Sequence, residues 1–317
     1  MTQVPFPATN GPQPIDWRVW WRLARPFSLT ASMVPVLVGS SVALASGKLN
    51  APDLLVAMLV SSLLIQIATN MFNEYFDYRH GLDTPETVGI AGAIVRGLVR
   101  ASVVFWAAVG CFAVAFALGL FIVARTSLEV LFAGVASALA GYLYSGGPIP
   151  IAYTPFGELE VFIFMGPVMV GLAYFIQAGE LSSSALWASI PVGCLVASIL
   201  IANNLRDVVA DGRVGRRTIP VALGRTTGLK VYTALLAGAY LSATAAVALG
   251  ALPITALAPI ITGKAPVRLV RLYNSVQEPR PLDAGVRGSA KLHAMFGLLF
   301  AAGIACGPLV GWRPPTL

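Results

Sequence analysis

Five uncharged apolar stretches, each about twenty residues long, restrict the folds open to this chain. They cover residues 54–73, 101–124, 161–178, 185–205 and 231–252. A helix needs about 20 apolar residues to cross roughly 30 Å of hydrocarbon, so each stretch is long enough to span a membrane. None of them alternates apolar and polar residues as the strands of a membrane barrel do. The sequence therefore predicts an all-α, polytopic membrane protein.

The composition argues against a soluble domain. Only 11% of the 317 residues are charged, whereas soluble domains carry about 25%. We expect about nine transmembrane helices around a central cavity open to the cytoplasmic side, at residues 27–46, 54–73, 102–123, 128–145, 158–176, 185–205, 229–249, 252–273 and 289–312. The eighth contains Pro253, Pro259 and Pro266. Proline interrupts the hydrogen bonds of a helix, so this segment is expected to be broken or tilted.

The distribution of basic residues predicts the orientation. If the N-terminus is cytoplasmic, only Lys48, Arg125 and Arg313 of the 21 basic residues fall on the outside. Basic residues favour the cytoplasmic side, so we expect the N-terminus and the longer connections to face the cytoplasm of the cell (inner) membrane. The same asymmetry accounts for the net charge of +7 without a nucleic-acid partner.

The chain is predicted to contain one membrane domain preceded by a surface segment. Residues 1–26 lack a continuous apolar core and combine aromatic with basic residues, namely Trp17, Trp20, Trp21, Arg18, Arg22 and Arg25. Such a segment is typical of an amphipathic helix at the membrane surface. We therefore expect a cytoplasmic amphipathic lead-in over residues 1–26 and a single transmembrane domain over residues 27–317.

A first polar cluster ends the second predicted span. Asn70, Asn73 and Asp77 are three and four residues apart, so they share one face of a helix. Glu74 lies between them, and Asp83 follows six residues after Asp77. Ionisable residues at the edge of a membrane helix are unfavourable unless they have a partner or a function.

A second polar cluster ends the sixth predicted span, four spans later. Asn203, Asp207 and Asp211 recur every four residues, and Asn204 reaches the same face. The shared order of Asn before spaced Asp suggests related positions in two halves of the chain. The alternative is a pair of solvated helix ends that cap cytoplasmic loops.

The two clusters together have the chemistry of a metal–diphosphate site. Carboxylate and amide oxygens without His or Cys favour a hard cation, Mg²⁺ or alternatively Mn²⁺. Arg96 follows the first cluster, and Arg216 and Arg217 follow the second. Arginine binds phosphate with a fork of N–H donors, so these three residues are candidates for diphosphate binding.

The motifs resemble those of the UbiA superfamily of intramembrane aromatic prenyltransferases. The family's first motif, Asn-Asp-x-x-Asp followed by another Asp, is similar to Asn73-Glu74-Tyr75-Phe76-Asp77 with Asp83. Its second motif, Asp-x-x-x-Asp, is matched by Asp207 and Asp211. Glu74 departs from the family pattern. Further similar stretches are Tyr144-Ser145-Gly146-Gly147-Pro148, Asn203-Asn204-Leu205-Arg206-Asp207 and Gly215-Arg216-Arg217-Thr218.

This resemblance implies a function and a set of site residues. Family members have nine helices and transfer a prenyl group from a polyprenyl diphosphate to a small aromatic acid, with Mg²⁺ held by the aspartates. Within the family, the similarity is greatest to members that prenylate 1,4-dihydroxy-2-naphthoate, with loss of CO₂, in menaquinone biosynthesis. The implied roles are metal binding through the diphosphate for Asn73, Asp77, Asp83, Asp207 and Asp211, and acceptor binding or cation stabilisation for Tyr144 and Glu158. Supporting roles are implied for Asn70, Glu74, Asn203 and Asn204.

Three alternatives remain open from the sequence. The first is the same chemistry on another aromatic ring, of the 4-hydroxybenzoate or homogentisate type, because the Asp clusters recognise only the donor. The second is a secondary transporter, although transporter sites lie near the bilayer midplane rather than at helix ends. The third is a non-catalytic family member, which the presence of all four aspartates disfavours.

Overall fold

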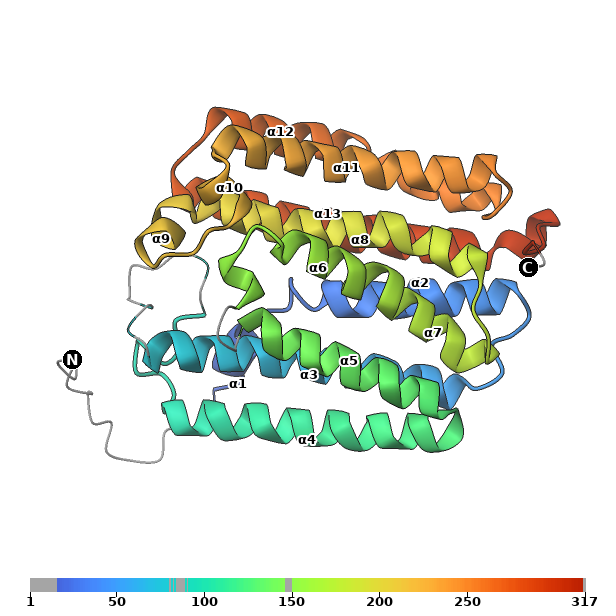
Figure 1. Cartoon of the computed structure of the whole chain (residues 1–317), viewed down its shortest axis with the longest axis horizontal. Coiled ribbons are helices and arrows are strands. Elements are labelled where there is room, and N and C mark those ends of the chain that lie inside the picture. The colour runs from blue at the N-terminus through green and yellow to red at the C-terminus, as the bar shows by residue number, and fades with distance from the viewer. Residues whose placement is uncertain are drawn as a thin grey trace.

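The computed structural model describes residues 16–79, 81, 83, 89, 91–145 and 150–315. In this part of the chain all regular structure is helical, as predicted, and the long helices lie side by side in a bundle (Figure 1). The first half comprises α1 (Trp17–Ala24), α2 (Thr30–Ala45), α3 (Pro52–Arg79), α4 (Ala101–Arg125), α5 (Leu128–Ser145) and η1 (Ile151–Tyr153). The second half comprises α6 (Gly157–Ile163), η2 (Phe164–Val168), α7 (Met169–Ala178), α8 (Ser183–Arg206), α9 (Val208–Arg213), α10 (Ile219–Ala222), α11 (Arg225–Ala248), η3 (Ile254–Thr262), α12 (Lys264–Ser275), α13 (Pro279–Ala305) and η4 (Gly307–Val310).

Within the described residues, six helical segments are long and apolar enough to cross a membrane. They are α3, α4, the continuous segment Gly157–Ala178, α8, α11 and α13. The segments Thr30–Ala45 and Leu128–Tyr144 are apolar but shorter. The chain is therefore a multi-pass membrane protein, while the count of nine spans and the central cavity remain predictions. The predicted eighth span is broken, because a 3₁₀ helix, η3, ends at Thr262 and α12 starts only at Lys264.

The helix α8 lies at the centre of the bundle. Of its most apolar 18 residues, 72% are buried within the protein, whereas only 17% are buried in α4. It packs against α11, α13, α2 and α6. The polar residues at the end of α8 are therefore held by the most enclosed helix of the molecule, and α4 presents most of its surface outward.

Close helix packing at α8 depends on glycine. A Cβ atom on Gly193 would lie 2.8 Å from the carbonyl oxygen of Phe162, and one on Gly166 would lie 2.9 Å from the Cα of Gly193. Small residues let membrane helices approach in this way, since packing rather than water exclusion drives their association. The segment that carries Phe162 also contains Pro167 within the π-helical turn η2.

Replacing Gly193 with alanine is expected to destabilise the protein. The added methyl group must push the α6 backbone away from α8, and such overpacking costs about 1–3 kcal/mol. Thermal unfolding in detergent should show a lower midpoint. Gly110→Ala in α4 is the matched control, because a Cβ there meets no atom within 4 Å. An equal response of the two variants would contradict the proposed role of this contact.

The helix α1 has the amphipathic character predicted for the lead-in. Val19 and Leu23 are buried against the bundle, whereas Trp17 and Trp21 are 67% and 58% exposed. The helix ends at Arg25, whose positive φ of 47° turns the chain sharply into the start of α2. Residues 1–15 of the predicted lead-in lie outside the described residues, and its assignment as a separate segment remains a prediction.

Candidate functional site

The two polar clusters meet at one end of the bundle. The helices α3 and α8 both end on that side (Figure 1). Gly89, in the connection after α3, has a φ of +86°, and a Cβ atom there would lie 2.5–2.8 Å from the guanidinium atoms of Arg206 at the end of α8. The connection from the first cluster therefore rests directly on the second. The sequence predicted that the two clusters act together, but it did not indicate this contact.

In the first cluster, Asp83 lies among other carboxylates. Burial, together with the charges of Asp77 and Glu74, raises its pKa to about 7 against the opposing effect of Arg25. The Oδ2 atom of Asp83 is buried and has no hydrogen-bond partner in the described part of the chain. A cation beside these carboxylates would relieve their mutual repulsion.

In the second cluster, each aspartate is paired with an arginine. Arg206 donates from Nε and Nη2 to the two oxygens of Asp207, at 2.8 and 2.6 Å. Arg216 lies 3.4 Å from Asp211. Burial raises the pKa of Asp211 to about 6, although the charge of Arg216 opposes the shift.

Arg216 connects the two clusters electrostatically. Its guanidinium lies 5.1 Å from the ring centre of Tyr153, which precedes α6. Burial lowers the pKa of Arg216, but the charge of Asp211 and, from the first cluster, that of Asp77 raise it, so the pKa lies above its usual value. A half-buried arginine that is influenced by carboxylates of both clusters has the donors to bind an anion beside a metal ion.

The side chain of Glu74 points into the interior of the protein. It is only 1% exposed and accepts hydrogen bonds from the backbone N–H groups of Ala91 and Ala93, at 3.2 and 2.7 Å. Arg25 lies 3.6 Å from the same carboxylate. These contacts give a supporting function to the residue that departs from the family motif, because Glu74 fastens the connection after α3 to the end of α1.

The predicted asparagines do not all reach the site. Asn70 is buried and donates to the carbonyl of Ala24 and to Ser28, both at 2.9 Å, so it joins α3 to the end of α1 and to the turn that precedes α2. Asn73 is exposed at the surface of α3. Asn203 donates to the carbonyl of Ile199 within its own helix, at 3.3 Å. Asn70 and Asn203 therefore have structural contacts.

A third group of residues lies beside Arg216 and Asp211. Tyr144 at the end of α5 is close enough to interact electrostatically with Glu158, Arg216 and Asp211. Asn204 donates to Oε1 of Glu158 at 2.8 Å, which fixes this buried carboxylate. Oε2 of Glu158 has no partner within the described residues. The structure thus brings Tyr144, Glu158 and Asn204 together.

The other two predicted arginines are at the surface. Arg96 and Arg217 are both exposed. The Arg96 guanidinium lies over Gly92, because a Cβ atom on Gly92 would be 3.2 Å from the guanidinium. The backbone N–H of Arg217 donates to the carbonyl of Tyr153. Both residues are at the cluster end of the bundle but are less enclosed than Arg216.

The sequence pattern missed three residues of this region, Arg25, Arg206 and Asp283. Arg206 immediately precedes Asp207, so its position next to a predicted metal ligand could have indicated a role in the site. Asp283 at the start of α13 accepts a hydrogen bond from Arg206 at 2.9 Å, although the two are separated by 77 residues. No local pattern indicates such a contact.

The aspartates do not form a ready-made metal site. In the part of the chain that the structure describes, no three His, Cys, Asp or Glu side chains come together closely enough to hold a metal ion. The carboxylates instead form two groups with arginines around them.

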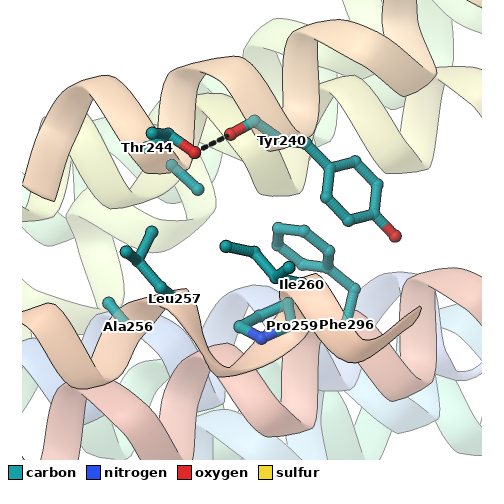
Figure 2. Close-up of a pocket in the computed structure, with 8 residues that line it drawn as sticks. Tyr240, Thr244, Ala256, Leu257, Pro259, Ile260 and Phe296 are labelled. Carbon is teal, nitrogen blue, oxygen red and sulfur yellow. Dashed lines mark hydrogen bonds between the residues drawn. The ribbon is translucent and has the colours of Figure 1, made fainter. Parts of the chain in front are cut away.

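A small pocket elsewhere in the bundle lacks this chemistry. It lies between α11, η3 and α13 and is lined by Tyr240, Ala243, Thr244, Ala256, Leu257, Pro259, Ile260 and Phe296 (Figure 2). None of these residues is charged, and Thr244 donates its hydroxyl to the carbonyl of Tyr240 within α11. The polar cluster end is therefore the better candidate site.

Comparison with known proteins agrees with the sequence motifs. A Bacillus subtilis (strain 168) protein named 1,4-dihydroxy-2-naphthoate octaprenyltransferase is 38% identical over 289 residues, which cover 90% of this chain and 92% of that protein. The UbiA prenyltransferase domain-containing protein 1 of Gallus gallus is 32% identical over 90% of this chain and 84% of its own length.

The fold is shared with solved structures. The structure of a UbiA homolog from Archaeoglobus fulgidus bound to DMAPP and Mg²⁺ has a TM-score of 0.61 and 18% identity, and covers 90% of this chain and 98% of that one. The model of the UbiA prenyltransferase family matches residues 32–281. This match and the identity to the Bacillus protein show that the chain belongs to the UbiA prenyltransferase family.

Proposed function

We propose that this chain catalyses Mg²⁺-dependent transfer of a polyprenyl group from a polyprenyl diphosphate to 1,4-dihydroxy-2-naphthoate, with loss of CO₂, as a step of menaquinone biosynthesis. The observation that carries the proposal is Arg216 at the end of an apolar bundle, where it pairs with Asp211 at 3.4 Å and is also influenced by the charge of Asp77 from the first cluster. The name of the Bacillus relative supports the acceptor, and family membership favours an enzyme over a transporter.

The residues present fit a magnesium ion. The candidate ligands Asp77, Asp83, Asp207 and Asp211 offer only carboxylate oxygens, which Mg²⁺ prefers. The partnerless buried oxygen of Asp83 would be satisfied by an ion. Exposed Asn73 is a further candidate ligand, and Mn²⁺ is expected to substitute. The bound ion would neutralise charge on the diphosphate as the allylic C–O bond breaks.

The arginines hold the diphosphate. Arg216 is half-buried, and its Nε has no partner within the described residues. It is therefore the principal donor toward the leaving group, which gains negative charge as its bond to carbon breaks. Arg96 and Arg217 are exposed and contribute at the rim. Asn70, Glu74 and Asn203 support the helices and the connection that carry these groups.

The acceptor lies between Tyr144 and Glu158. Asn204 fixes one oxygen of Glu158, so the free oxygen can accept a hydrogen bond from a ring hydroxyl. The ring face of Tyr144 stabilises the allylic cation. The ring carbon that bears the carboxylate attacks this cation. The electron pair of its C–CO₂ bond then restores the aromatic ring as CO₂ leaves, so no base has to remove a ring proton.

An acceptor panel tests this proposal. Purified protein in detergent is incubated with Mg²⁺, a polyprenyl diphosphate and either 1,4-dihydroxy-2-naphthoate, 4-hydroxybenzoate or homogentisate. We expect prenylated naphthoquinol and one CO₂ per diphosphate released, only with the first acid. Prenylation of 4-hydroxybenzoate without CO₂ would contradict the proposed acceptor, and no product from any ring would contradict the enzyme function.

Metal affinity is expected to weaken as the pH falls. The pKa of Asp83 is raised to about 7 and that of Asp211 to about 6. Below these values a proton occupies each carboxyl, and Mg²⁺ must displace it. Between pH 7.5 and 5.5, the Mg²⁺ concentration that half-saturates binding of a prenyl thiodiphosphate should rise on the order of tenfold or more. The Mg²⁺ affinity of the free thiodiphosphate is the control, and a change no larger than that would contradict the prediction.

We further propose that the N-terminus and the site face the cytoplasm. At the opposite end of the bundle, Lys48 pairs with Glu180 and Arg125 pairs with Asp53, so the basic residues there are compensated by acids. Cys306 is exposed at the end of α13, on that same side. A membrane-impermeant maleimide should label it in intact cells, and Cys306→Ser should abolish the labelling. Labelling only after cell lysis would indicate the reverse orientation.

A further inference from the structure

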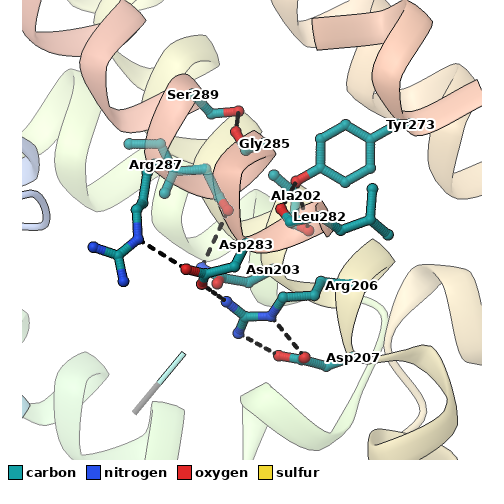
Figure 3. A network of polar contacts seen from close by, with 11 residues as sticks. Ala202, Asn203, Arg206, Asp207, Tyr273, Leu282, Asp283, Gly285, Arg287 and Ser289 are labelled. Atoms are coloured by element: carbon teal, nitrogen blue, oxygen red, sulfur yellow. Dashed lines mark hydrogen bonds and ion pairs between the residues drawn. The ribbon is translucent and has the colours of Figure 1, made fainter. Parts of the chain in front are cut away.

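Arg206, at the end of α8, lies between Asp207 and Asp283 of α13 (Figure 3). It also lies beside Gly89 in the connection after α3. Two of its nitrogens donate to both oxygens of Asp207, and the third, Nη1, donates to Asp283 on α13 at 2.9 Å. The other oxygen of Asp283 accepts from Nε of Arg287 at 2.8 Å. The Arg206 side chain is only 8% exposed, so its charge depends on these two carboxylates rather than on water.

The backbone of Gly89 limits the movement of the Arg206 guanidinium. A Cβ atom at Gly89 would lie 2.5–2.8 Å from the guanidinium, which therefore has no room to move toward the connection after α3. The position of Arg206 is set by Asp207, Asp283 and this backbone together. A shift of the guanidinium would change the contact between the two polar clusters.

The pairing of Arg206 with Asp207 competes with metal binding. Both oxygens of Asp207 accept hydrogen bonds from the guanidinium of Arg206. A metal ion at Asp207 would repel the guanidinium, which can remain buried only if another carboxylate compensates it. Asp283 supplies this second carboxylate, at 2.9 Å from Nη1 of Arg206.

We propose that Asp283 is a positioning residue for the metal–diphosphate site, an inference that rests on the proposed function. Asp283 accepts a hydrogen bond from Nη1 of Arg206, so the positive charge of Arg206 is shared between two carboxylates. Asp207 therefore remains able to bind a metal ion. Without Asp283, the whole charge of Arg206 would remain on Asp207 and would compete more strongly with Mg²⁺.

The test measures binding without turnover. Radiolabelled farnesyl thiodiphosphate is bound to purified protein in detergent over a range of Mg²⁺ concentrations. Asp283→Asn should raise the half-saturating Mg²⁺ concentration by about tenfold, as is usual when a residue that orients a metal ligand is lost. Asp283→Glu should restore a value close to that of the wild type. Glu278→Gln is the matched control, because Glu278 is an exposed acid at the start of the same helix.

Gly89→Ala provides a second variant that leaves the helix bundle untouched. Its methyl group would meet the Arg206 guanidinium, and alanine is also strained at the φ of +86°, so the variant should disturb this contact and raise the Mg²⁺ requirement. If Asp283→Asn does not fold, the Mg²⁺ requirement of Gly89→Ala tests the inference instead. Unchanged Mg²⁺ dependence in a folded Asp283→Asn protein would overturn this inference but not the proposed function. The same holds for Gly89→Ala if only that variant can be measured. A wild-type protein that binds the thiodiphosphate without any dependence on Mg²⁺ would overturn the proposed function and the inference with it.

Discussion

Replacing Asp77 or Asp211 with alanine should lower the rate of prenyl transfer on the order of 10³-fold. Each carboxylate is proposed to hold the ion that neutralises the leaving diphosphate, and metal ions contribute several kcal/mol to such transition states. The two residues belong to different helices, and each is expected to be indispensable because the site needs both clusters. Product formation from labelled polyprenyl diphosphate measures the effect, and EDTA should abolish the wild-type rate.

A control on the same helix separates this effect from a loss of folding. Asp53 lies at the other end of α3, where it pairs with Arg125 at 3.0 Å. Asp53→Ala removes the same side chain from the same helix, far from the site. It should leave the rate close to that of the wild type. A comparable loss in Asp53→Ala would mean that charge removal from α3 impairs the protein generally.

Replacing Arg216 with alanine should lower kcat/KM by about 10²–10³-fold, as is typical when one preorganised donor to a developing anion is removed. The residue contacts Asp211 and Tyr153 and is influenced by Asp77, so it lies where the two clusters face each other. Arg216→Lys should recover only part of the activity, because an ammonium lacks the fork of donors that fits a diphosphate. Steady-state kinetics with the donor varied provides the measurement.

Arg213→Ala is the matched control for Arg216. Arg213 ends α9, three residues earlier, and is exposed. Its removal changes the net charge of the connection equally, and we expect little effect on kcat/KM. If both variants lose activity to the same extent, the connection as a whole, and not the guanidinium of Arg216, determines donor binding.

The sequence was sufficient for the fold because hydrocarbon imposes simple length and polarity limits on helices. The five uncharged stretches became spans of the structure, and the prolines near residue 259 indicated where the eighth segment breaks. The 3₁₀ form of η3 and the π-helical turn at Pro167 were not predicted. These features depend on how neighbouring helices pack, which the local sequence does not specify.

The candidate site was only partly predictable. Helical spacing placed Asn70, Asp77, Asp207 and Asp211 at helix ends, and the resemblance implied a supporting role for Asn70, but neither indicated its partners. Asn70 in fact bonds with Ala24 and Ser28. Spacing describes which face a residue occupies, whereas the partner on that face comes from a distant part of the chain.

Glu74 and Asp283 illustrate this limit most clearly. Glu74 shares the motif with Asp77, yet its partners are Arg25 and the backbone of residues 91–93. Asp283 has no motif around it, and only the packing of α13 against α8 brings it to Arg206. Long-range contacts therefore decide which acids are available to a metal ion.

Binding of Mn²⁺ in the presence of farnesyl thiodiphosphate, followed by electron paramagnetic resonance, tests the central claim most directly. If Asp77 on α3 and Asp211 on α9 belong to one metal–diphosphate site, either alanine substitution alone should abolish high-affinity Mn²⁺ binding, while Asp53→Ala should leave it intact. Full Mn²⁺ binding in one of the two site variants would contradict the account, because the clusters would then not share a site.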